Sequence, residues 1–385
     1  MGAGGLIASG IRFKGRLASV AVAVSFLIII IAVCVAAGFR SEIRAGVSDM
    51  AGDILMSRPD ADFFGEEKPF TDTLSYMDRL LDIPGVSCIT PVIFRAGIAR
   101  SGGNIQGIMF KGVPGLDSTL HATVPGTLAD ALDLKVGDRM LTWFVGEKVK
   151  ARQFVVSRIQ ESVLDAEGTM IVKVPLEDLQ RLNEWQEHEV SALQIMMDED
   201  SRERAGLDEA ARFASIVSSA YASEDEAVLK AVPSTVRYNQ LFDWLDLIDA
   251  NVTAILILMI VVAGFNMISG LLILLLRNIG TIGMLKTMGM TDKGIRGVFL
   301  RVAARLVFFG MLAGNAVALA LCAVQDCTHL ITLNPENYFV SFVPVSINIP
   351  HILIADVLAF AAILVTMLIP STFIAKVDPA QTVGK

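Results

Sequence analysis

Charged side chains are scarce in this sequence. Asp, Glu, Lys and Arg make up only 19% of its 385 residues, whereas 53% are hydrophobic, and the mean hydropathy is +0.58. Soluble globular domains carry about a quarter charged residues, so this composition favours a membrane-inserted chain. The net charge of −8 is spread unevenly, because the acidic residues concentrate in the central part of the chain.

Cysteine is also rare, and its spacing excludes two kinds of site. The four residues are Cys34, Cys88, Cys322 and Cys327, and none lies in C-x-x-C spacing, which supports neither a disulfide framework nor a metal site. The catalytic patterns G-x-S-x-G and H-E-x-x-H are missing, as is the G-x-x-x-x-G-K-[ST] loop that cradles phosphates. We therefore expect a non-catalytic chain that does not bind ATP by itself and holds no metal.

Four apolar runs are long enough to cross a bilayer, which needs about 20 residues per helix. They cover residues 17–38, 252–276, 298–324 and 352–374. The first could instead be a secretory signal peptide, since three basic residues precede it and Val35-Ala36-Ala37 resembles a cleavage site. Signal-peptide cores have only about 7–15 apolar residues, so the length favours a retained membrane helix.

The basic residues predict the orientation of these helices. Lys and Arg lie before the first run, between the second and third, and after the fourth, whereas residues 325–350 contain neither. Short segments rich in Lys and Arg remain cytoplasmic. We therefore expect residues 1–16, 277–297 and 375–385 to be cytoplasmic, and residues 39–251 and 325–351 to lie on the outer side.

Residues 39–251 predict an α+β domain with helical stalks. Residues 40–50 are expected to continue the first membrane helix, and a hairpin is expected around Ser101-Gly102-Gly103. Further strands are predicted at residues 54–57, 168–174 and 190–197, and helices at 70–81, 176–187 and 200–222. The absence of a long parallel-sheet pattern favours an α+β arrangement of short elements.

Small and polar residues within the apolar runs predict contacts between helices. Gly310 and Gly314 form a small-x-x-x-small pair, which lets two helices approach closely. Asn266 and Asn315 are predicted to form hydrogen bonds to neighbouring helices.

The segment "IGTIGMLKTMGMTDKGIRGVFL", residues 279–300, is both basic and amphipathic. Its spacing predicts a helix that passes through Gly289 without interruption. Ile282, Leu285 and Met288 would face a soluble partner or the membrane surface, and Lys286 would face water or acidic groups. From the residues alone, two interpretations of this segment remain equally open: it docks onto a soluble partner, or it lies on the lipid surface.

This segment resembles the cytoplasmic coupling helix of the FtsX-like, MacB-type (type VII) ABC transporter permease family. Its I-[GA]-x-L-[KR]-x-[ML]-G-[AM] core rests on an ABC ATPase in that family. The matching residues are Ile282, Gly283, Leu285, Lys286, Met288 and Gly289. One departure is Arg277, which stands where the family usually has Glu.

Both ends of the chain extend the resemblance. "LIASGIRF" near the N-terminus, "YFVSFVPVSIN" at residues 338–348 and "IPSTFIAKVDPAQTV" near the C-terminus are similar to the lipoprotein-releasing LolC/LolE branch of the family. This branch has one plus three membrane helices around a large periplasmic domain. The residues between the first two runs resemble that domain only in outline.

The resemblance implies a permease subunit in the inner membrane of a Gram-negative cell. Its partners would be a separate ATPase dimer carrying ATP and Mg²⁺, a second permease copy or paralogue, a lipoprotein substrate and a periplasmic lipoprotein carrier. Two alternatives within the family are a signal transducer that regulates periplasmic cell-wall hydrolases and an efflux permease for a small hydrophobic compound. No residue that binds substrate is predicted.

Overall fold

The computed structural model describes residues 16–61, 68–116, 118–146, 148–160, 170–334 and 338–371. The chain divides into two compact units. The membrane unit comprises residues 1–40, 245–332 and 342–385, and the sheet unit comprises residues 41–244 and 333–341. The cytoplasmic tail predicted at residues 375–385 and nearly all of the N-terminal segment, residues 1–15, lie outside the described residues.

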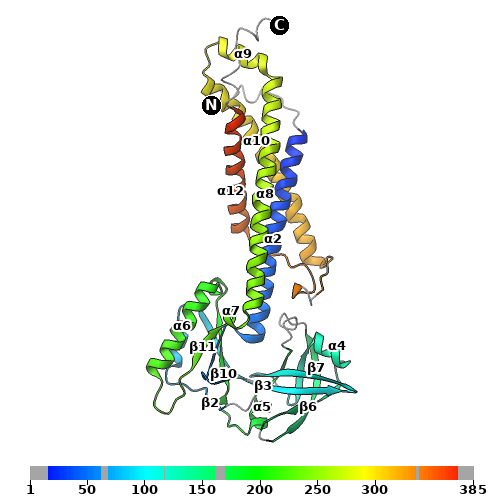
Figure 1. The fold of residues 1–385 in the computed structure, drawn as a ribbon, viewed down its shortest axis with the longest axis vertical. Coiled ribbons are helices and arrows are strands. Elements are labelled where there is room, and N and C mark those ends of the chain that lie inside the picture. The colour runs from blue at the N-terminus through cyan, green and yellow to red at the C-terminus, as the bar shows by residue number, and fades with distance from the viewer. Residues whose placement is uncertain are drawn as a thin grey trace. The chain divides into compact units, whose positions relative to one another are not determined.

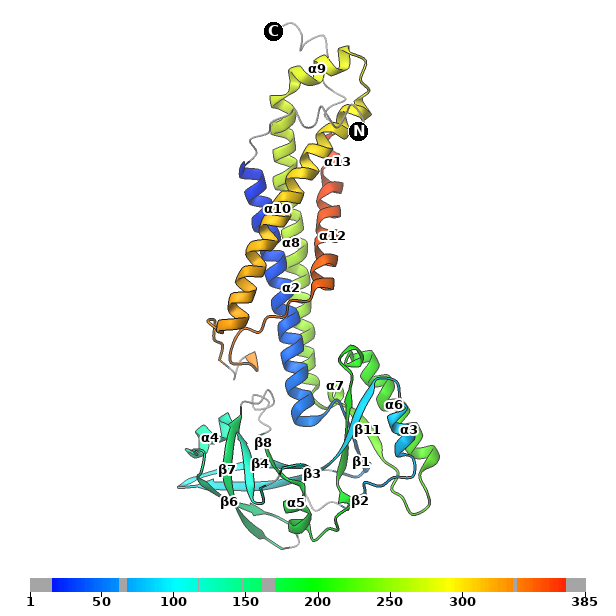
Figure 2. The same cartoon turned by 180° about the vertical axis from the view of Figure 1, so that it is seen from behind.

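Four long apolar helices make up most of the membrane unit (Figures 1 and 2). They are α2 (Arg16–Ala51), α8 (Asn239–Arg277), α10 (Asp292–Thr328) and α12 (Ile349–Thr366), and the short α13 (Leu368–Ser371) follows the last. All four are long and apolar enough to cross a bilayer. The predicted fold class, with one helix before and three after a large α+β domain, is confirmed.

Apolar side chains from all four helices form one buried cluster in the membrane unit. It includes Phe26 of α2, Met267 of α8, Val307 of α10 and Ile363 of α12, each with at most 1% of its surface exposed. An ion pair between Arg40 and Asp249 links α2 to α8. The first and second membrane helices are therefore held to each other by both packing and charge.

A nine-stranded sheet forms the centre of the sheet unit, in the order β11-β1-β10-β3-β4-β8-β5-β7-β6. The strands are β1 (Ile54–Ser57), β3 (Val86–Ser101), β4 (Asn104–Val113), β5 (His121–Pro125), β6 (Arg139–Phe144), β7 (Lys150–Gln160), β8 (Ile171–Pro175), β10 (Ala192–Met197) and β11 (Lys230–Pro233). An additional pairing of β3 with β6 closes six of them into a ring. Inside the unit's core, the ring of Phe110 stacks on that of Phe154 and lies tilted against that of Phe144.

The ring of strands is mostly antiparallel. Only β4 with β8 and β5 with β7 run parallel among the described pairs. The predicted hairpin is confirmed, since Ser101 pairs with Asn104 between β3 and β4. The continuation of the first membrane helix is also confirmed, because α2 extends to Ala51.

Helices and a small second sheet complete the sheet unit. The helices are α3 (Met77–Leu81), α4 (Gly126–Leu132), α5 (Leu176–Asn183), α6 (Arg204–Tyr221) and α7 (Ser234–Arg237), with a 3₁₀ turn η2 (Glu199–Ser201); β2 (Phe70–Thr71) pairs with β9 (Glu189–Val190).

Two predicted helices were too long. The one expected at residues 70–81 is wrong in its first half, because Phe70 pairs with Val190 as a buried strand residue. The one expected at residues 176–187 ends early, because Glu184 adopts a left-handed conformation with φ 62°.

Candidate functional site

The segment between α8 and α10 is a short helix, α9 (Ile279–Thr287), flanked by two breaks (Figure 2). Asn278 interrupts the helix at its start, with its side-chain amide donating to the carbonyl of Leu274 at 2.8 Å. A side chain bonded to its own preceding turn competes with the backbone pattern of a helix. The helix α9 is therefore a separate element between α8 and α10, and the predicted segment at residues 277–297 also includes the last residue of α8 and the first turns of α10.

Gly289 ends α9 and reverses the chain. Its φ of 87° lies in the left-handed region, which glycine adopts without steric cost. The amide of Gly289 donates to the carbonyl of Lys286, and the amide of Met290 donates to that of Leu285, each at 3.0 Å. These two bonds are the Schellman pattern of a helix C-terminus. The prediction of an uninterrupted helix through Gly289 is wrong, because apolar spacing continues on both sides of a turn that only the glycine marks.

The structure separates the six predicted coupling residues into buried and exposed groups. Ile282 and Gly283 are buried within the membrane unit, whereas Leu285 is half-buried and packs against its apolar cluster. Met288 is 74% exposed, and Met284, which the sequence pattern did not select, is 60% exposed. The apolar surface that α9 leaves uncovered in this chain therefore consists of methionines. The expectation that Ile282 faces a partner is wrong, because its side chain fills the core beneath the helix.

Lys286 forms an ion pair within the segment. Its Nζ lies 3.0 Å from Oδ1 of Asp292, and its side chain is only 12% exposed. Asp292 is the first residue of α10, where the side chain of Thr291 caps the helix by accepting from the amide of Gly294. A carboxylate in the first turn also suits the positive end of the helix dipole. Lys286 thus ties the end of α9 to the start of α10, and of the two expected surroundings, water or acidic groups, it has the second.

Gly310 and Gly314 of the third helix pack against the first helix. A Cβ atom on Gly314 would lie 2.3 Å from the carbonyl oxygen of Ala23, and one on Gly310 would lie 2.9 Å from Cγ1 of Val22. Both distances are shorter than any normal contact, so only glycine permits this approach. The sequence predicted a close helix contact at this pair, and the structure identifies α2 as the neighbour.

A polar pair joins the third and fourth helices. The side-chain amide of Asn315 donates to Oδ2 of Asp356 at 2.6 Å. The predicted interhelical hydrogen bond of Asn315 is therefore confirmed. Asp356 was missed, although it is the one acidic residue in the apolar run at residues 352–374. Intramembrane carboxylates are rare and usually paired inside a bundle, so this residue type alone could have marked it.

One protein family matches the part of the chain that contains most of the helices just described. The FtsX-like permease C-terminal family covers residues 253–379, which include α9, α10, α12 and most of α8. Residues 253–379 are thus similar to an FtsX-like permease domain. The helix α9, the pair Gly310 and Gly314, and the Asn315–Asp356 pair all fall within the matched range.

Two relatives align with nearly the whole chain. The lipoprotein-releasing system transmembrane protein LolC of Neisseria meningitidis serogroup B is 21% identical over 95% of this chain and 92% of its own length. The corresponding LolE protein of Haemophilus influenzae is 20% identical over 96% of this chain and 94% of its own length. Similarity therefore extends from the permease domain through the sheet unit.

Two solved structures resemble part of the permease. The extracellular domain of the ABC-type transporter YknZ covers 46% of this chain at 12% identity with a TM-score of 0.30. The periplasmic region of MacB from Actinobacillus actinomycetemcomitans covers 52% at 10% identity with a TM-score of 0.32.

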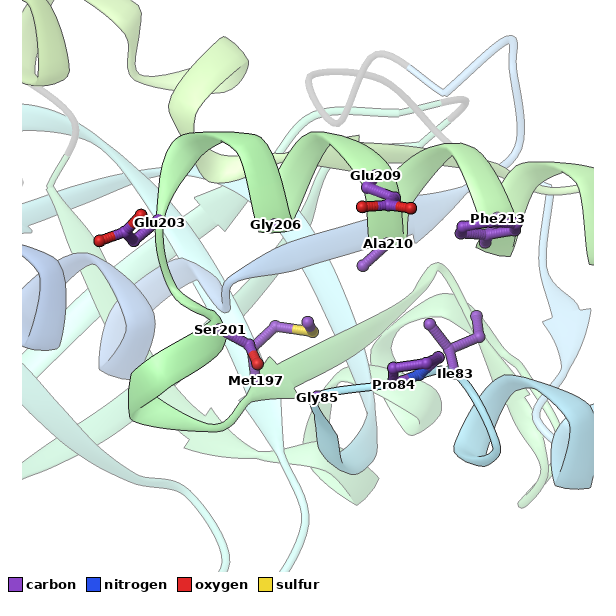
Figure 3. A pocket seen from close by; sticks show the side chains of 10 residues that line it. All are labelled: Ile83, Pro84, Gly85, Met197, Ser201, Glu203, Gly206, Glu209, Ala210 and Phe213. Carbon is purple, nitrogen blue, oxygen red and sulfur yellow. The ribbon is translucent and has the colours of Figure 1, made fainter.

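A cavity of about 370 Å³ lies in the sheet unit, between α6 and the turn that precedes β3 (Figure 3). Ile83 and Pro84 line it from the turn, and Ala210 and Phe213 line it from α6. Its lining is about equally polar and apolar, and it includes the exposed carboxylates of Glu203, which precedes α6, and of Glu209 on the helix. Within the part of the chain that the structure describes, no group of three His, Cys, Asp or Glu side chains is arranged to hold a metal ion.

Proposed function

We propose that this chain is the transmembrane permease subunit of an ABC transporter that extracts lipoproteins from the inner membrane and releases them toward a periplasmic carrier for outer-membrane sorting. The observation that carries this proposal is the extent of the similarity to the LolC and LolE proteins. The alignments span more than nine-tenths of this chain and of each relative, and are not confined to the permease domain.

The permease requires an external source of energy for this reaction. Each acyl CH₂ group removed from a bilayer costs about 0.8 kcal/mol, so releasing a lipoprotein with several chains is strongly unfavourable. The chain has no phosphate-binding loop. A separate ATPase dimer would therefore bind ATP and Mg²⁺ and hydrolyse the ATP. This chain would transmit the movement of that dimer without catalysing hydrolysis.

We place the ATPase contact at the exposed face of α9. Met284 and Met288 offer flexible apolar side chains there, and Arg277 and Lys293 are exposed cations of the same segment. Methionine adapts to irregular partner surfaces. In this arrangement Ile282, Gly283 and Leu285 seat α9 on the membrane helices, and Lys286 and Gly289 fix the turn to α10. Pressure on α9 would then reach α10 and α8 directly.

A second permease, either another copy or a paralogue, would complete the transport path. The membrane helices of one chain leave apolar side chains uncovered, among them Ile257 and Phe265 of α8 and Val357 of α12. In a bilayer these side chains face lipid or another helix. The distribution of Lys and Arg favours cytoplasmic termini and a periplasmic sheet unit.

Depletion of the permease in its native host tests the proposed function. Inner and outer membranes would be separated on a density gradient, and newly made outer-membrane lipoproteins would be located by pulse labelling. We expect these lipoproteins to accumulate in the inner membrane within one or two generations. Normal sorting with altered cell separation would instead support the transducer, and normal sorting with sensitivity to hydrophobic compounds would support efflux.

A further inference from the structure

Lys111 is the most unusual charged residue of the sheet unit. It lies on β4 with only 2% of its surface exposed. Lysine is almost never buried to this degree unless its amine is fully paired, because removing the charge from water is costly. The permease segment, the glycine pair and the cavity do not involve this residue, so its burial requires a separate explanation.

The partners of Lys111 are backbone carbonyls at the end of α2. Its Nζ donates to the carbonyl oxygen of Met50 at 2.7 Å and to that of Asp49 at 3.3 Å. The last carbonyls of a helix have no partner within the helix, and a cation there also interacts favourably with the helix dipole. Lys111 therefore caps the C-terminus of the first membrane helix from a neighbouring strand.

Other groups hold the same helix end. Gly52, at φ 80°, donates its amide to the carbonyl of Ser48 at 2.9 Å, which is the left-handed cap of a helix. Gln194 of β10 donates its side-chain amide to the same carbonyl at 3.2 Å. Three successive carbonyls, those of Ser48, Asp49 and Met50, thus accept side-chain donors from β4 and β10.

The side chain of Asp49 adds a second link to the sheet. Its Oδ2 lies 2.7 Å from Nζ of Lys173 on β8, and Lys173 is the direct neighbour of Lys111 in the parallel pairing of β4 with β8. Just beyond the helix, Oδ2 of Asp53 accepts from the amide of Met197 at 2.7 Å. The end of α2 therefore cannot turn or slide without breaking bonds to β4, β8 and β10.

We propose that Lys111 is a positioning residue that clamps the end of the first membrane helix to the sheet, so that movement of α2 is passed to the sheet unit rather than lost by fraying of its last turn. The coupling part of this inference rests on the proposed function, whereas the clamp itself does not. Its burial excludes a catalytic role for the amine, because no substrate reaches a group that is 2% exposed.

Amide hydrogen exchange in the full-length permease, held in lipid nanodiscs, tests the clamp. The substitution Lys111→Met removes the donors at nearly constant shape. Lys173→Met is the matched control because the amine of Lys173 donates to the exposed carboxylate of Asp49, whereas that of Lys111 donates to helix carbonyls. We expect Lys111→Met to lower the protection of the amides of residues 50–53 by about tenfold or more, and Lys173→Met by less than about threefold. Unchanged protection in Lys111→Met, or equal losses in both variants, would overturn the clamp.

If Lys111→Met does not fold, acetylation of the wild-type protein tests whether the amine of Lys111 stays bonded at the end of α2. Lys111 should then resist the reagent until global unfolding while Lys173 reacts, and equal reaction of the two lysines would overturn the clamp. For coupling, the number of lipoproteins released per ATP hydrolysed should fall in Lys111→Met while hydrolysis continues. An unchanged ratio would overturn the coupling role. Absence of release by the wild-type complex would count against the proposed function alone, since the exchange result does not depend on it.

Discussion

The side-chain amide of Asn315 lies 2.6 Å from Oδ2 of Asp356 and links the third membrane helix to the fourth. The Oδ1 atoms of Asn315 and Asp356 are both buried without a hydrogen-bond partner in the described structure. Asp356 is 6% exposed. Unpartnered polar atoms at such a site make this hydrogen bond important, because its loss would leave a buried carboxyl group with no donor.

Removing the amide should therefore destabilise the permease more than altering the acid. We expect Asn315→Ala to lower the free energy of unfolding by about 1–3 kcal/mol, the usual cost of an unsatisfied buried polar group. Asp356→Asn keeps a side chain that can both accept from and donate to Asn315, so its loss should be smaller. Thermal unfolding of both variants in the same detergent measures the difference. A greater loss in Asp356→Asn would show that the amide is not the stabilising partner.

The turn at Gly289 should be intolerant of substitution. Proline fixes φ near −65° and removes the amide that donates to Lys286, so Gly289→Pro should cost about 3 kcal/mol or more at this turn. We expect insertion to remain intact while ATP hydrolysis no longer drives release. The appropriate control is Gly280→Ala in the same helix, where an added Cβ meets open space. Equal activity of the two variants would remove the basis for placing the coupling turn at Gly289.

Because α10 packs closely on α2, two glycine-to-alanine substitutions in α10 should change the stability of the membrane unit in opposite directions. Gly314→Ala forces a Cβ against the carbonyl of Ala23 and should destabilise the membrane unit by about 1–3 kcal/mol. Gly297→Ala lies in the same helix with no atom within 4 Å of the new Cβ. Because alanine favours a helix over glycine, it should stabilise by up to about 1 kcal/mol. Melting temperatures that shift in the same direction would contradict the assigned contact.

Lys111 should make stability depend on pH. Burial, and next the neighbouring Lys173 ammonium, lower the pKa of Lys111 to about 7, while Asp49 opposes this shift. The unfolded chain, with an ordinary lysine pKa near 10.4, then binds more protons than the folded chain between about pH 7 and pH 10. Stability should rise across this window, by up to about 1.4 kcal/mol per pH unit, and stay level with respect to this group below it.

The clamp is compatible with this pH dependence, because a neutral amine still has two N–H donors for the carbonyls of Asp49 and Met50. Denaturant unfolding between pH 7 and pH 9 measures the slope. Lys111→Met should abolish the contribution, and Lys173→Met should move its onset to higher pH, because a repelling charge is lost. A slope that persists unchanged in Lys111→Met would assign the titration to another group.

Features that depend on local sequence were predictable. The four membrane helices, the extension of the first to Ala51 and the hairpin at residues 101–104 follow from runs of apolar residues and from turn-forming residues. The break at Gly289 was missed because the apolar positions keep helical spacing across it. In such a segment the glycine itself carries the signal, and it precedes a Thr-Asp helix start at residues 291–292.

Features that depend on distant residues were not predictable from one sequence. Lys111 is a single lysine in a strand, and only the pairing of β4 beside the end of α2 gives it its partners. The closure of six strands by the pairing of β3 with β6 likewise joins segments about 40 residues apart. For α9, periodicity selected Ile282, Leu285 and Met288 but not Met284, and it could not tell that Ile282 packs inward while Met288 remains exposed.

The most direct test of the account is ATP-driven release from proteoliposomes that contain the permease, its ATPase and a fluorescent triacylated lipoprotein, with the soluble carrier outside. We predict transfer of the lipoprotein to the carrier only with hydrolysable ATP. A charge placed on the exposed face of α9, as in Met288→Glu, should abolish transfer, whereas Gly280→Ala should leave it intact. Steady ATP hydrolysis by the assembled wild-type complex with the lipoprotein remaining in the bilayer would contradict the account.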